Sequence, residues 1–592
     1  MKHAFGLLAL LVAGQVAAQQ AADSVAPEAA GVGVFEGLPA GLTQAMTAKA
    51  EGRVVEAEAW MVAAANPHAV KAGADVLAAG GTAADALVAV QVVLGLVEPQ
   101  SSGLGGGAFL VWYDAASGEI TTLDGRETAP VAATPRLFQD ENGEPMGFFD
   151  AVIGGRSVGT PGTPALLQEV HQRWGNQNWA GLLAPAKSLA EKGFVVSPRL
   201  AGLVARDAER LAVSKSTASY FLPQGVPITA GAVLKNPDYA RTLEHFAKSG
   251  AAAFYSGQIG RDIVATVQGA SGNPGVLDEI DLALYQVKSR PAVCAPYRAY
   301  DVCGMGPPSS GAVAVGQMLG ALAPYDLSAG PGDSNVRRLM GDASRLAFAD
   351  RGRYLADSDF VPVPVNGLIA PDYMAKRAAL LDRSTALDTV APGDPTFDHA
   401  LLWADDESLE LPSTSHISIV DRFGNVASMT TTIENAFGSR LMTNGFLLNN
   451  ELTDFSFRSH RAGLPIANRV APGKRPRSSM APTIVMKDGA PVIALGSPGG
   501  SRIIGYVAQT IVAMLDWGMD AQQAVSVPHA VNRFGTYDLE TGTQALRLTD
   551  DLTAMGFDVG SRPLTSGLHV IAIGQTLTGG ADPRREGVAF GQ

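Results

Sequence analysis

The chain changes character near residue 414. Helical spacing of apolar residues dominates from about 160 to 385, whereas strand-like alternation dominates after 414. Between them, residues 386–413 are polar, acidic and proline-containing, which is typical of a linker. Sheets formed by the second part need helices from the first to cover them. The pattern therefore predicts an α+β fold with stacked sheets between helical layers.

The spacing of apolar residues also predicts the individual elements. The turn at 103–107 is rich in glycine, but it lacks the Lys-Ser/Thr of a P-loop and precedes a strand. It therefore predicts close backbone packing between a helix and a sheet rather than a phosphate site. We expect strands at 61–64, 108–113, 415–420, 425–432, 446–449, 482–487, 491–496, 544–548 and 567–574. We expect helices at 67–79, 83–96, 166–174, 182–192, 200–211, 240–249, 259–267, 311–322, 336–354 and 503–515.

The composition excludes several classes of partner. The chain has 592 residues, of which 17% are charged and 46% hydrophobic, enough for a substantial core. Its net charge is −13 and it has no basic block, which argues against a nucleic-acid partner. An acidic surface also argues against adsorption to anionic membranes.

The N-terminus has the pattern of a secretory signal. Lys2 and His3 precede an apolar run at 4–13, and small residues at 16–18 give a cleavage site after Ala18. The run is too short for a membrane span. We therefore expect a signal peptide at 1–18, a mobile leader at 19–54, and a periplasmic or secreted protein.

The chain has two cysteines, Cys294 and Cys303, at the two ends of a predicted hairpin. An oxidising compartment would allow a disulfide between them, but two buried thiols fit the sequence equally well. The nine histidines are scattered without a metal-ligand spacing. We expect no metal and no cofactor.

Thr414 stands where the linker ends and the strands begin. A threonine hydroxyl is a poor nucleophile unless a base stands beside it, and the α-amine of an N-terminal threonine supplies that base. This chemistry requires cleavage between Ser413 and Thr414. The strand at 415–420 would then begin a new chain at an edge of the fold. Taken alone, Thr414 also fits an ordinary residue at the start of a strand.

Motifs along nearly the whole chain after residue 55 resemble the gamma-glutamyltransferase family, and they occur in the family's order. Before the linker they are Gly103-Leu104-Gly105-Gly106-Gly107, Asp124-Gly125-Arg126-Glu127, Gly159-Thr160-Pro161-Gly162 and Pro307-Pro308-Ser309-Ser310-Gly311. After it they are Thr414-Ser415-His416, Thr430-Thr431-Thr432-Ile433-Glu434, Phe437-Gly438, residues 447–455, Pro472-Gly473-Lys474-Arg475-Pro476, Ser478-Ser479-Met480 and Gly496-Ser497-Pro498-Gly499-Gly500.

This resemblance implies the four-layer αββα sandwich of N-terminal-nucleophile hydrolases. It also implies a large subunit at 55–413 and a small catalytic subunit at 414–592, which stay interlocked as a heterodimer after self-cleavage. The implied activity is gamma-glutamyl transfer and hydrolysis, with glutathione and other gamma-glutamyl compounds as donors and water, amino acids or peptides as acceptors.

The resemblance also assigns roles to matching residues. It makes Thr414 the nucleophile in both cleavage and catalysis, with Thr432 bonded to its surroundings. Gly499 and Gly500 match the oxyanion hole, although their turn also fits a simple helix N-terminus. Arg126 matches the arginine that binds the substrate α-carboxylate, and Ser478 and Ser479 match the family's paired serine contacts. Asp454 matches the ligand of the α-amino group and Glu451 its neighbour, while Glu434 matches a substrate-binding position that is Asn in many members and Glu in others. Without the family context, Asp454 and Glu451 fit solvated loop acids and Thr432 an ordinary strand residue.

One segment departs from some bacterial members, which carry a longer lid over the glutamyl site. Here residues 456–470 are shorter, lack tyrosine and carry Arg458, Arg461 and Arg469. We expect a more open pocket, partial exposure of the acidic ligands, and either a preference for acidic or larger acceptors or three solvated arginines. The alternatives to a transferase are a glutaryl or cephalosporin-type acylase on the same fold, and an unprocessed periplasmic binding protein.

Overall fold

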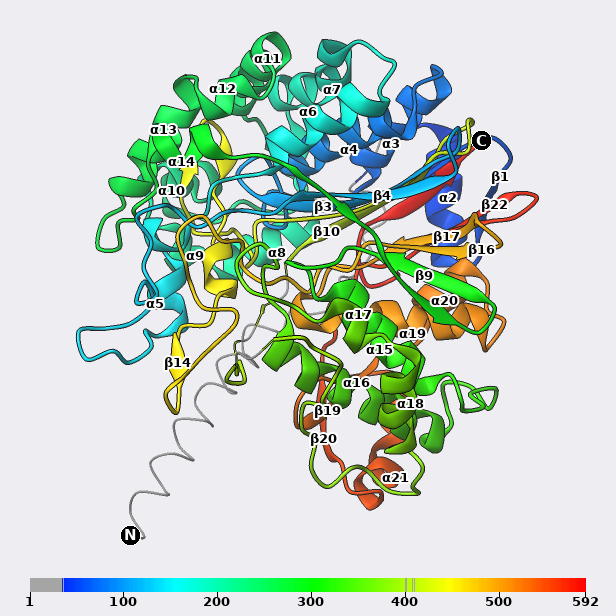
Figure 1. Ribbon diagram of the computed structural model, residues 1–592. Coiled ribbons are helices and arrows are strands. Elements are labelled where there is room, and N and C mark those ends of the chain that lie inside the picture. Colours follow the sequence, from blue (N-terminus) through cyan, green and yellow to red (C-terminus); the bar gives the residue numbers. More distant parts are fainter. Residues whose placement is uncertain (1–34, 36, 400–401, 407, 409, 412) are drawn as a thin grey trace.

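The computed structural model describes residues 35, 37–399, 402–406, 408, 410–411 and 413–592. Two β-sheets lie face to face between two layers of helices (Figure 1). An apolar cluster that includes Met61, Val111, Ile484 and Ile571 fills the space between the sheets. The predicted four-layer αββα sandwich is therefore confirmed.

Strands from before and after Thr414 share both seven-stranded sheets. In sheet order, the first consists of β1 (Val55–Ala57), β22 (Leu577–Ala581), β21 (His569–Ile573), β17 (Ala490–Gly496), β16 (Thr483–Lys487), β9 (Tyr300–Gly304) and β8 (Val293–Tyr297). The second consists of β23 (Val588–Gly591), β2 (Met61–Ala64), β10 (Ser415–Val420), β11 (Val426–Thr432), β3 (Gly107–Asp114), β4 (Glu119–Gly125) and β7 (Lys288–Pro291).

Strand β10 follows Thr414 directly and lies inside its sheet. It pairs with β2 on one side and β11 on the other, and all its residues are buried. Ile417 and Ile419 belong to the core beneath the helices, while the Ser418 hydroxyl donates to the His569 carbonyl of the facing sheet at 3.2 Å. The prediction that this strand starts at an edge of the fold is wrong, because its small polar residues pack between two sheets instead of facing water.

Helices cover the outer face of each sheet (Figure 1). The predicted helix at 200–211 is split in two, at Asp207, and the others are confirmed within a few residues. Over the second sheet lie α3 (Pro67–Ala78), α4 (Ala83–Val97), α6 (Thr163–Trp174), α7 (Trp179–Lys192), α8 (Pro198–Arg206), α9 (Ala208–Leu211), α11 (Pro237–Ser249) and α13 (Gln258–Gln268). Over the first lie α15 (Gly311–Leu322), α16 (Ser334–Tyr354), α18 (Pro371–Ala379), α19 (Ile503–Leu515) and α20 (Ala521–Ser526).

The strand predicted at 544–548 is a short 3₁₀ helix, η5 (Gln544–Leu548). Ala545 and Leu548 are its buried residues, three positions apart, and the Thr543 hydroxyl accepts from the Ala545 N–H at 3.3 Å. The apparent alternation of Leu546 and Leu548 therefore came from a capped helical turn. The other late strand is confirmed as β21.

Residues 40–50 belong to the fold, although their composition predicted a mobile leader. They form α2 (Ala40–Ala50), whose Leu42, Ala45 and Ala48 are buried against β23. The predicted signal peptide at 1–18 lies outside the described residues. Within the described part of the chain, no helix is both long and apolar enough to span a membrane.

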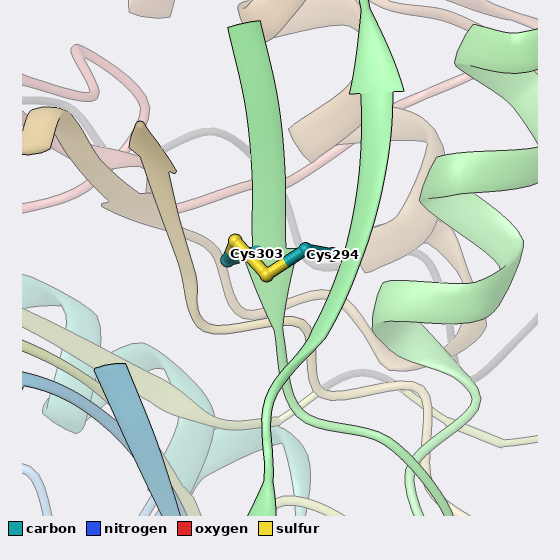
Figure 2. Close-up of a disulfide and its surroundings, with 2 residues drawn as sticks. All are labelled: Cys294 and Cys303. Atoms are coloured by element: carbon teal, nitrogen blue, oxygen red, sulfur yellow. A yellow bond between two sulfur atoms is a disulfide. The ribbon is translucent and has the colours of Figure 1, made fainter. Parts of the chain in front are cut away.

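Cys294 and Cys303 form a disulfide across β8 and β9 (Figure 2). The two residues lie directly opposite each other in the antiparallel register. Of the two readings that the sequence left open, the structure shows the disulfide. Both cysteines precede the linker, so this bond joins no residue from before Thr414 to one after it.

The glycine-rich turn packs against the strands that carry the candidate site, as predicted. A Cβ atom at Gly105 would lie 2.1 Å from the Leu447 carbonyl oxygen, and one at Gly106 would lie 1.9 Å from that of Thr432. No larger residue fits at either position. The turn therefore fixes the end of β11 and the loop that follows it.

Candidate active site

Thr414 lies at the entrance to β10 with its hydroxyl directed at the preceding peptide bond. This hydroxyl donates to the Ser413 carbonyl oxygen, which also accepts from the Thr432 hydroxyl at 2.9 Å. The Thr414 and Thr432 hydroxyl oxygens are 3.3 Å apart. Arg585 donates to the Thr414 carbonyl at 3.1 Å. Two hydroxyls thus converge on the Ser413–Thr414 bond, where the sequence predicts cleavage.

Thr432 ends β11, and its hydroxyl also accepts from the Glu434 N–H at 2.9 Å. Glu434 has a φ of +74°, a left-handed conformation that turns the chain sharply after the strand. Its carboxylate accepts from Asn450 and from the Leu411 N–H. The turn therefore connects the two threonines to the acidic loop at 450–454.

One small pocket is lined by most of the predicted site residues. Ser413 and Gly499 do not line it, although each directly precedes a residue that does. Glu410 and Leu411, in the segment just before Thr414, also line it and were not predicted as site residues. The lining residues are Arg126, Glu410, Leu411, Thr414, Thr432, Glu434, Glu451, Asp454, Ser478, Ser479, Met480, Gly500 and Ile503.

Gly499 and Gly500 form a tight turn before α19, with φ values of +141° and +56°. A Cβ atom at Gly500 would lie 2.8 Å from the carbonyl carbon of Leu411, so only glycine lets the two backbones meet. A turn at the start of a helix directs N–H groups away from the helix, toward the site of a developing negative charge. The geometry thus fits both the predicted oxyanion role and a helix start.

Arg126, Glu451 and Asp454 form a buried ionic cluster at one side of the pocket. The two guanidinium Nη groups bind Glu451 and Asp454 respectively. Nε also donates to the Pro476 carbonyl at 3.2 Å, and Nη2 to the Arg477 carbonyl at 3.0 Å. Arg126, Glu451 and Asp454 are 0%, 1% and 4% exposed. The predicted partial exposure of the two acids is therefore wrong in the uncut chain.

Buried carboxyl groups outnumber the guanidinium in this cluster. Burial raises the pKa of Glu434, Glu451 and Asp454 well above the ordinary range, and Arg126 only partly opposes it for the last two. Burial also opposes the charge of Arg126, but Glu451 and Asp454 outweigh it and raise the arginine's pKa. A cation beside these carboxyl groups would favour their ionised form, so the pocket suits a ligand that carries an ammonium group.

Glu127 is a fourth buried acid of this cluster, and the sequence analysis gave it no role. Its carboxylate lies 3.9 Å from Arg126 Nη1 and packs against Gly107. Burial raises its pKa to about 8. The sequence signal for its place in the cluster was its position directly after Arg126 in a motif that matches the family.

Replacing Glu127 by glutamine should flatten the pH dependence of stability. The folded carboxyl group keeps its proton up to about pH 8, whereas an unfolded glutamate loses it near ~4.3. Stability therefore falls as pH rises between these values, by up to ~1.4 kcal/mol per pH unit for one proton. We expect the melting temperature of uncut Thr414→Ala protein to fall more from pH 5 to pH 8 than that of Thr414→Ala/Glu127→Gln.

The matched control is Glu141→Gln, which changes an exposed carboxyl group. This variant should follow the parent protein at both pH values. Equal pH slopes for the parent and Glu127→Gln would show that Glu127 is already ionised in the folded state.

Ser478 and Ser479 line the same pocket as the acidic loop. The Ser478 backbone carbonyl accepts from the Ser310 hydroxyl at 2.7 Å, and the Ser479 hydroxyl accepts from Arg351 Nη2 at 2.9 Å. Arg351 comes from α16 and is fully buried. The sequence analysis did not assign it, because the contact joins residues 128 positions apart.

The short segment at 456–470 does not line the pocket. It forms a small hairpin of β14 (His460–Arg461) and β15 (Leu464–Pro465). Arg458 pairs with Glu144 at 3.0 Å on the surface, and Arg469 lies 3.2 Å from His460. These contacts match the expected surface arginines better than a cationic acceptor site. Among the described residues, no group of three or more His, Cys, Asp or Glu is arranged to hold a metal ion.

Comparison with known proteins agrees with this geometry. The family described as gamma-glutamyltranspeptidase matches residues 69–592. A glutathione hydrolase proenzyme of Bacillus subtilis (strain 168) is 38% identical over 551 residues, which cover 90% of this chain and 91% of that protein. An acylase ACY 1 proenzyme of Pseudomonas sp. (strain SE83) is 36% identical over 538 residues, covering 89% and 92%.

Among solved structures, a cephalosporin acylase from Bacillus halodurans superposes with a TM-score of 0.81 at 26% identity, covering 91% of this chain and 97% of that one. The family match, the two relatives and the superposed structure thus each cover most of the chain. The protein is an enzyme and belongs to the gamma-glutamyltranspeptidase family.

Proposed function

We propose that the chain cuts itself before Thr414 and then transfers or hydrolyses gamma-glutamyl groups, with glutathione-like amides as donors. The observation that carries this proposal is the pocket itself. Thr414 lines it together with a buried cluster that has both a guanidinium and an excess of carboxyl groups. A glutamyl head group carries the complementary pair, a carboxylate and an ammonium.

In the cleavage step, the Thr414 hydroxyl oxygen attacks the Ser413 carbonyl carbon, and the Ser413–Thr414 peptide C–N bond breaks. The hydroxyl proton ends on the departing nitrogen, which becomes the α-amine of Thr414. Water then hydrolyses the resulting ester and releases the carboxylate of Ser413. The products are a large subunit ending at Ser413 and a small subunit beginning at Thr414, held together as a heterodimer.

In catalysis, the new α-amine accepts the Thr414 hydroxyl proton as the oxygen attacks the donor γ-carbonyl. An α-amine has an ordinary pKa of ~7.7, so it can act as the base near neutral pH. The same group returns the proton to the leaving amine. Water or an acceptor amine then resolves the gamma-glutamyl ester. Gly499 and Gly500 N–H groups would stabilise the oxyanion of each step.

An acylase is the second candidate, because two relatives and one structural neighbour carry that name. A glutaryl group has a terminal carboxylate but no ammonium, so it leaves the acids of the cluster uncompensated. Glu451 and Asp454, both buried on Arg126, therefore favour the gamma-glutamyl donor. The N-terminal signal pattern supports export, and we propose a periplasmic or secreted location.

The test compares γ-glutamyl-4-nitroanilide with glutaryl-4-nitroanilide, which differ by one ammonium group. A site built around a polar group can reject the analogue that lacks it by up to ~10⁴-fold, and we expect a preference of at least ~10-fold in kcat/KM for the γ-glutamyl donor at pH 7. Equal or reversed values would reject the transferase and favour the acylase. A preference that disappears in Asp454→Asn would assign the discrimination to this carboxylate.

A further inference from the structure

The segment before the cleavage point is bound through its acidic side chains. Asp405 pairs with Arg353 at 2.7 Å, Asp406 with Arg477 at 2.9 Å, and Glu410 with Arg351. Asp406 and Glu410 are buried. The composition predicted a flexible linker, but each of these three acids has an arginine partner. Among them, Glu410 is the one that lines the pocket with Thr414.

The Glu410 carboxylate occupies a site with several donors. Arg351 Nη2 binds it and also donates to the Ser479 hydroxyl at 2.9 Å, while Arg351 Nε donates to the Ser310 hydroxyl at 2.8 Å. Arg477 Nε lies 3.9 Å from the same carboxylate. This is a fixed guanidinium, oriented by two serine hydroxyls, that holds a carboxylate at the wall of the pocket.

Arg126 and Arg351 differ in whether their acidic partners stay in place after the proposed cleavage. The partners of Arg126, Glu451 and Asp454, follow Thr414 and stay with the small subunit. The partner of Arg351 is Glu410, four residues before Thr414, so it belongs to the end that cleavage releases. Burial and the neighbouring Arg477 lower the pKa of Arg351 to about 10, which still leaves it protonated at neutral pH.

We infer that Arg351, oriented by Ser310 and Ser479, is a carboxylate-binding subsite of the mature enzyme and that Glu410 occupies it in the uncut chain as a stand-in for substrate. This inference rests on the proposed function of Thr414. Withdrawal of the released end exposes a buried guanidinium without its counter-ion, and a substrate carboxylate restores the pair. That carboxylate comes either from the glutamyl head group or from the leaving group.

The first test needs no catalysis. In uncut Thr414→Ala/Glu410→Ala protein the subsite is vacated, and acetate is the probe. We expect 100 mM acetate, relative to chloride at equal ionic strength, to raise the melting temperature by about 1–3 °C. Thr414→Ala alone should not respond, because Glu410 fills the site. Adding Arg351→Gln to the double variant should remove the response.

The matched control is Thr414→Ala/Asp405→Ala, which vacates a half-exposed acid–arginine pair outside the pocket and should not respond to acetate. The inference would be overturned if acetate did not raise the melting temperature of Thr414→Ala/Glu410→Ala. It would also be overturned if adding Arg351→Gln left that rise unchanged. The acetate measurement needs no catalysis, so it tests the inference even if an Arg351 variant does not cut itself.

The second test identifies the source of the carboxylate with three anilides. 4-Aminobutanoyl-4-nitroanilide carries no carboxylate, γ-glutamyl-4-nitroanilide carries one in its head group, and γ-glutamyl-3-carboxy-4-nitroanilide adds one on the leaving group. Arg351→Gln should raise KM at least ~10-fold for the substrate whose carboxylate binds Arg351 and leave its carboxylate-free counterpart nearly unchanged. Arg351→Lys should recover part of the loss.

If Arg351→Gln reduces the difference in KM between the first two anilides, Arg351 binds the head-group carboxylate. If it reduces the difference in KM between the last two, Arg351 binds the leaving-group carboxylate. Equal losses on all three would overturn the inference. Wild-type enzyme inactive on every γ-glutamyl donor would instead refute the proposed function, while the acetate result would stand.

Discussion

Thr414→Ala should remain a single uncut chain and lose at least ~10⁴-fold in activity, because one hydroxyl serves as nucleophile in both the cut and the catalytic cycle. In the uncut chain, this hydroxyl and that of Thr432 both bond to the Ser413 carbonyl. Removing it leaves Thr432, which can bond to the carbonyl but is not attached to the nitrogen that would become the base.

A denaturing gel and N-terminal sequencing of the smaller band measure this result. The wild type should give a band beginning at Thr414. Thr414→Ser keeps a hydroxyl at the same position and should still be cut, which separates loss of chemistry from loss of fold. Cleavage of Thr414→Ala at the same bond would reject self-processing.

Arg126→Ala should lower kcat/KM for γ-glutamyl-4-nitroanilide by at least ~30-fold, and Asp454→Ala should do the same. Losing one partner of a buried charge pair costs about 2–5 kcal/mol, part of which is the penalty on the charge left behind. Here Arg126→Ala leaves Glu451 and Asp454 without their shared guanidinium. The loss should appear mainly in KM, because the cluster binds the head group rather than the reacting carbonyl.

Arg458→Ala is the matched control for Arg126→Ala. It removes a guanidinium from a surface ion pair with Glu144, where such pairs contribute about 0–1 kcal/mol, and it should keep wild-type kinetics. Cleavage in all three variants would show that the fold is intact. Near-wild-type kinetics in Arg126→Ala or Asp454→Ala would exclude that residue from the site.

The sequence predicted the elements around the nucleophile because their patterns are local. Alternation identified β10 and β11, and a continuous apolar helix after two glycines identified α19. The same reasoning failed for η5, where two leucines in a capped turn imitated a strand. It also placed β10 at an edge, since short polar residues between two sheets look like residues facing water.

The site was predictable only where motifs carried it. Family motifs named Arg126, Glu451 and Asp454, but not that all three would be buried in one cluster. The pairing of Glu410 with Arg351 joins the linker to a helix 59 positions earlier, and no periodicity encodes such a contact. Two sequence features were the available signals for this contact: the acidic run before Thr414 and the arginine-rich helix at 334–354. Both features also fit solvated surfaces.

The shared sheets have a consequence for the reversibility of unfolding. Strand β2 lies between β23 and β10, and β11 pairs with β3, so each half completes the other's hydrogen-bond ladder. Before the cut, the halves are tethered and refolding is a unimolecular process, independent of concentration. After the proposed cut, the same ladders would have to form between separate molecules, and the effective concentration set by the tether would be lost. Cleavage would thus convert a chain that can refold alone into an assembly whose recovery depends on protein concentration.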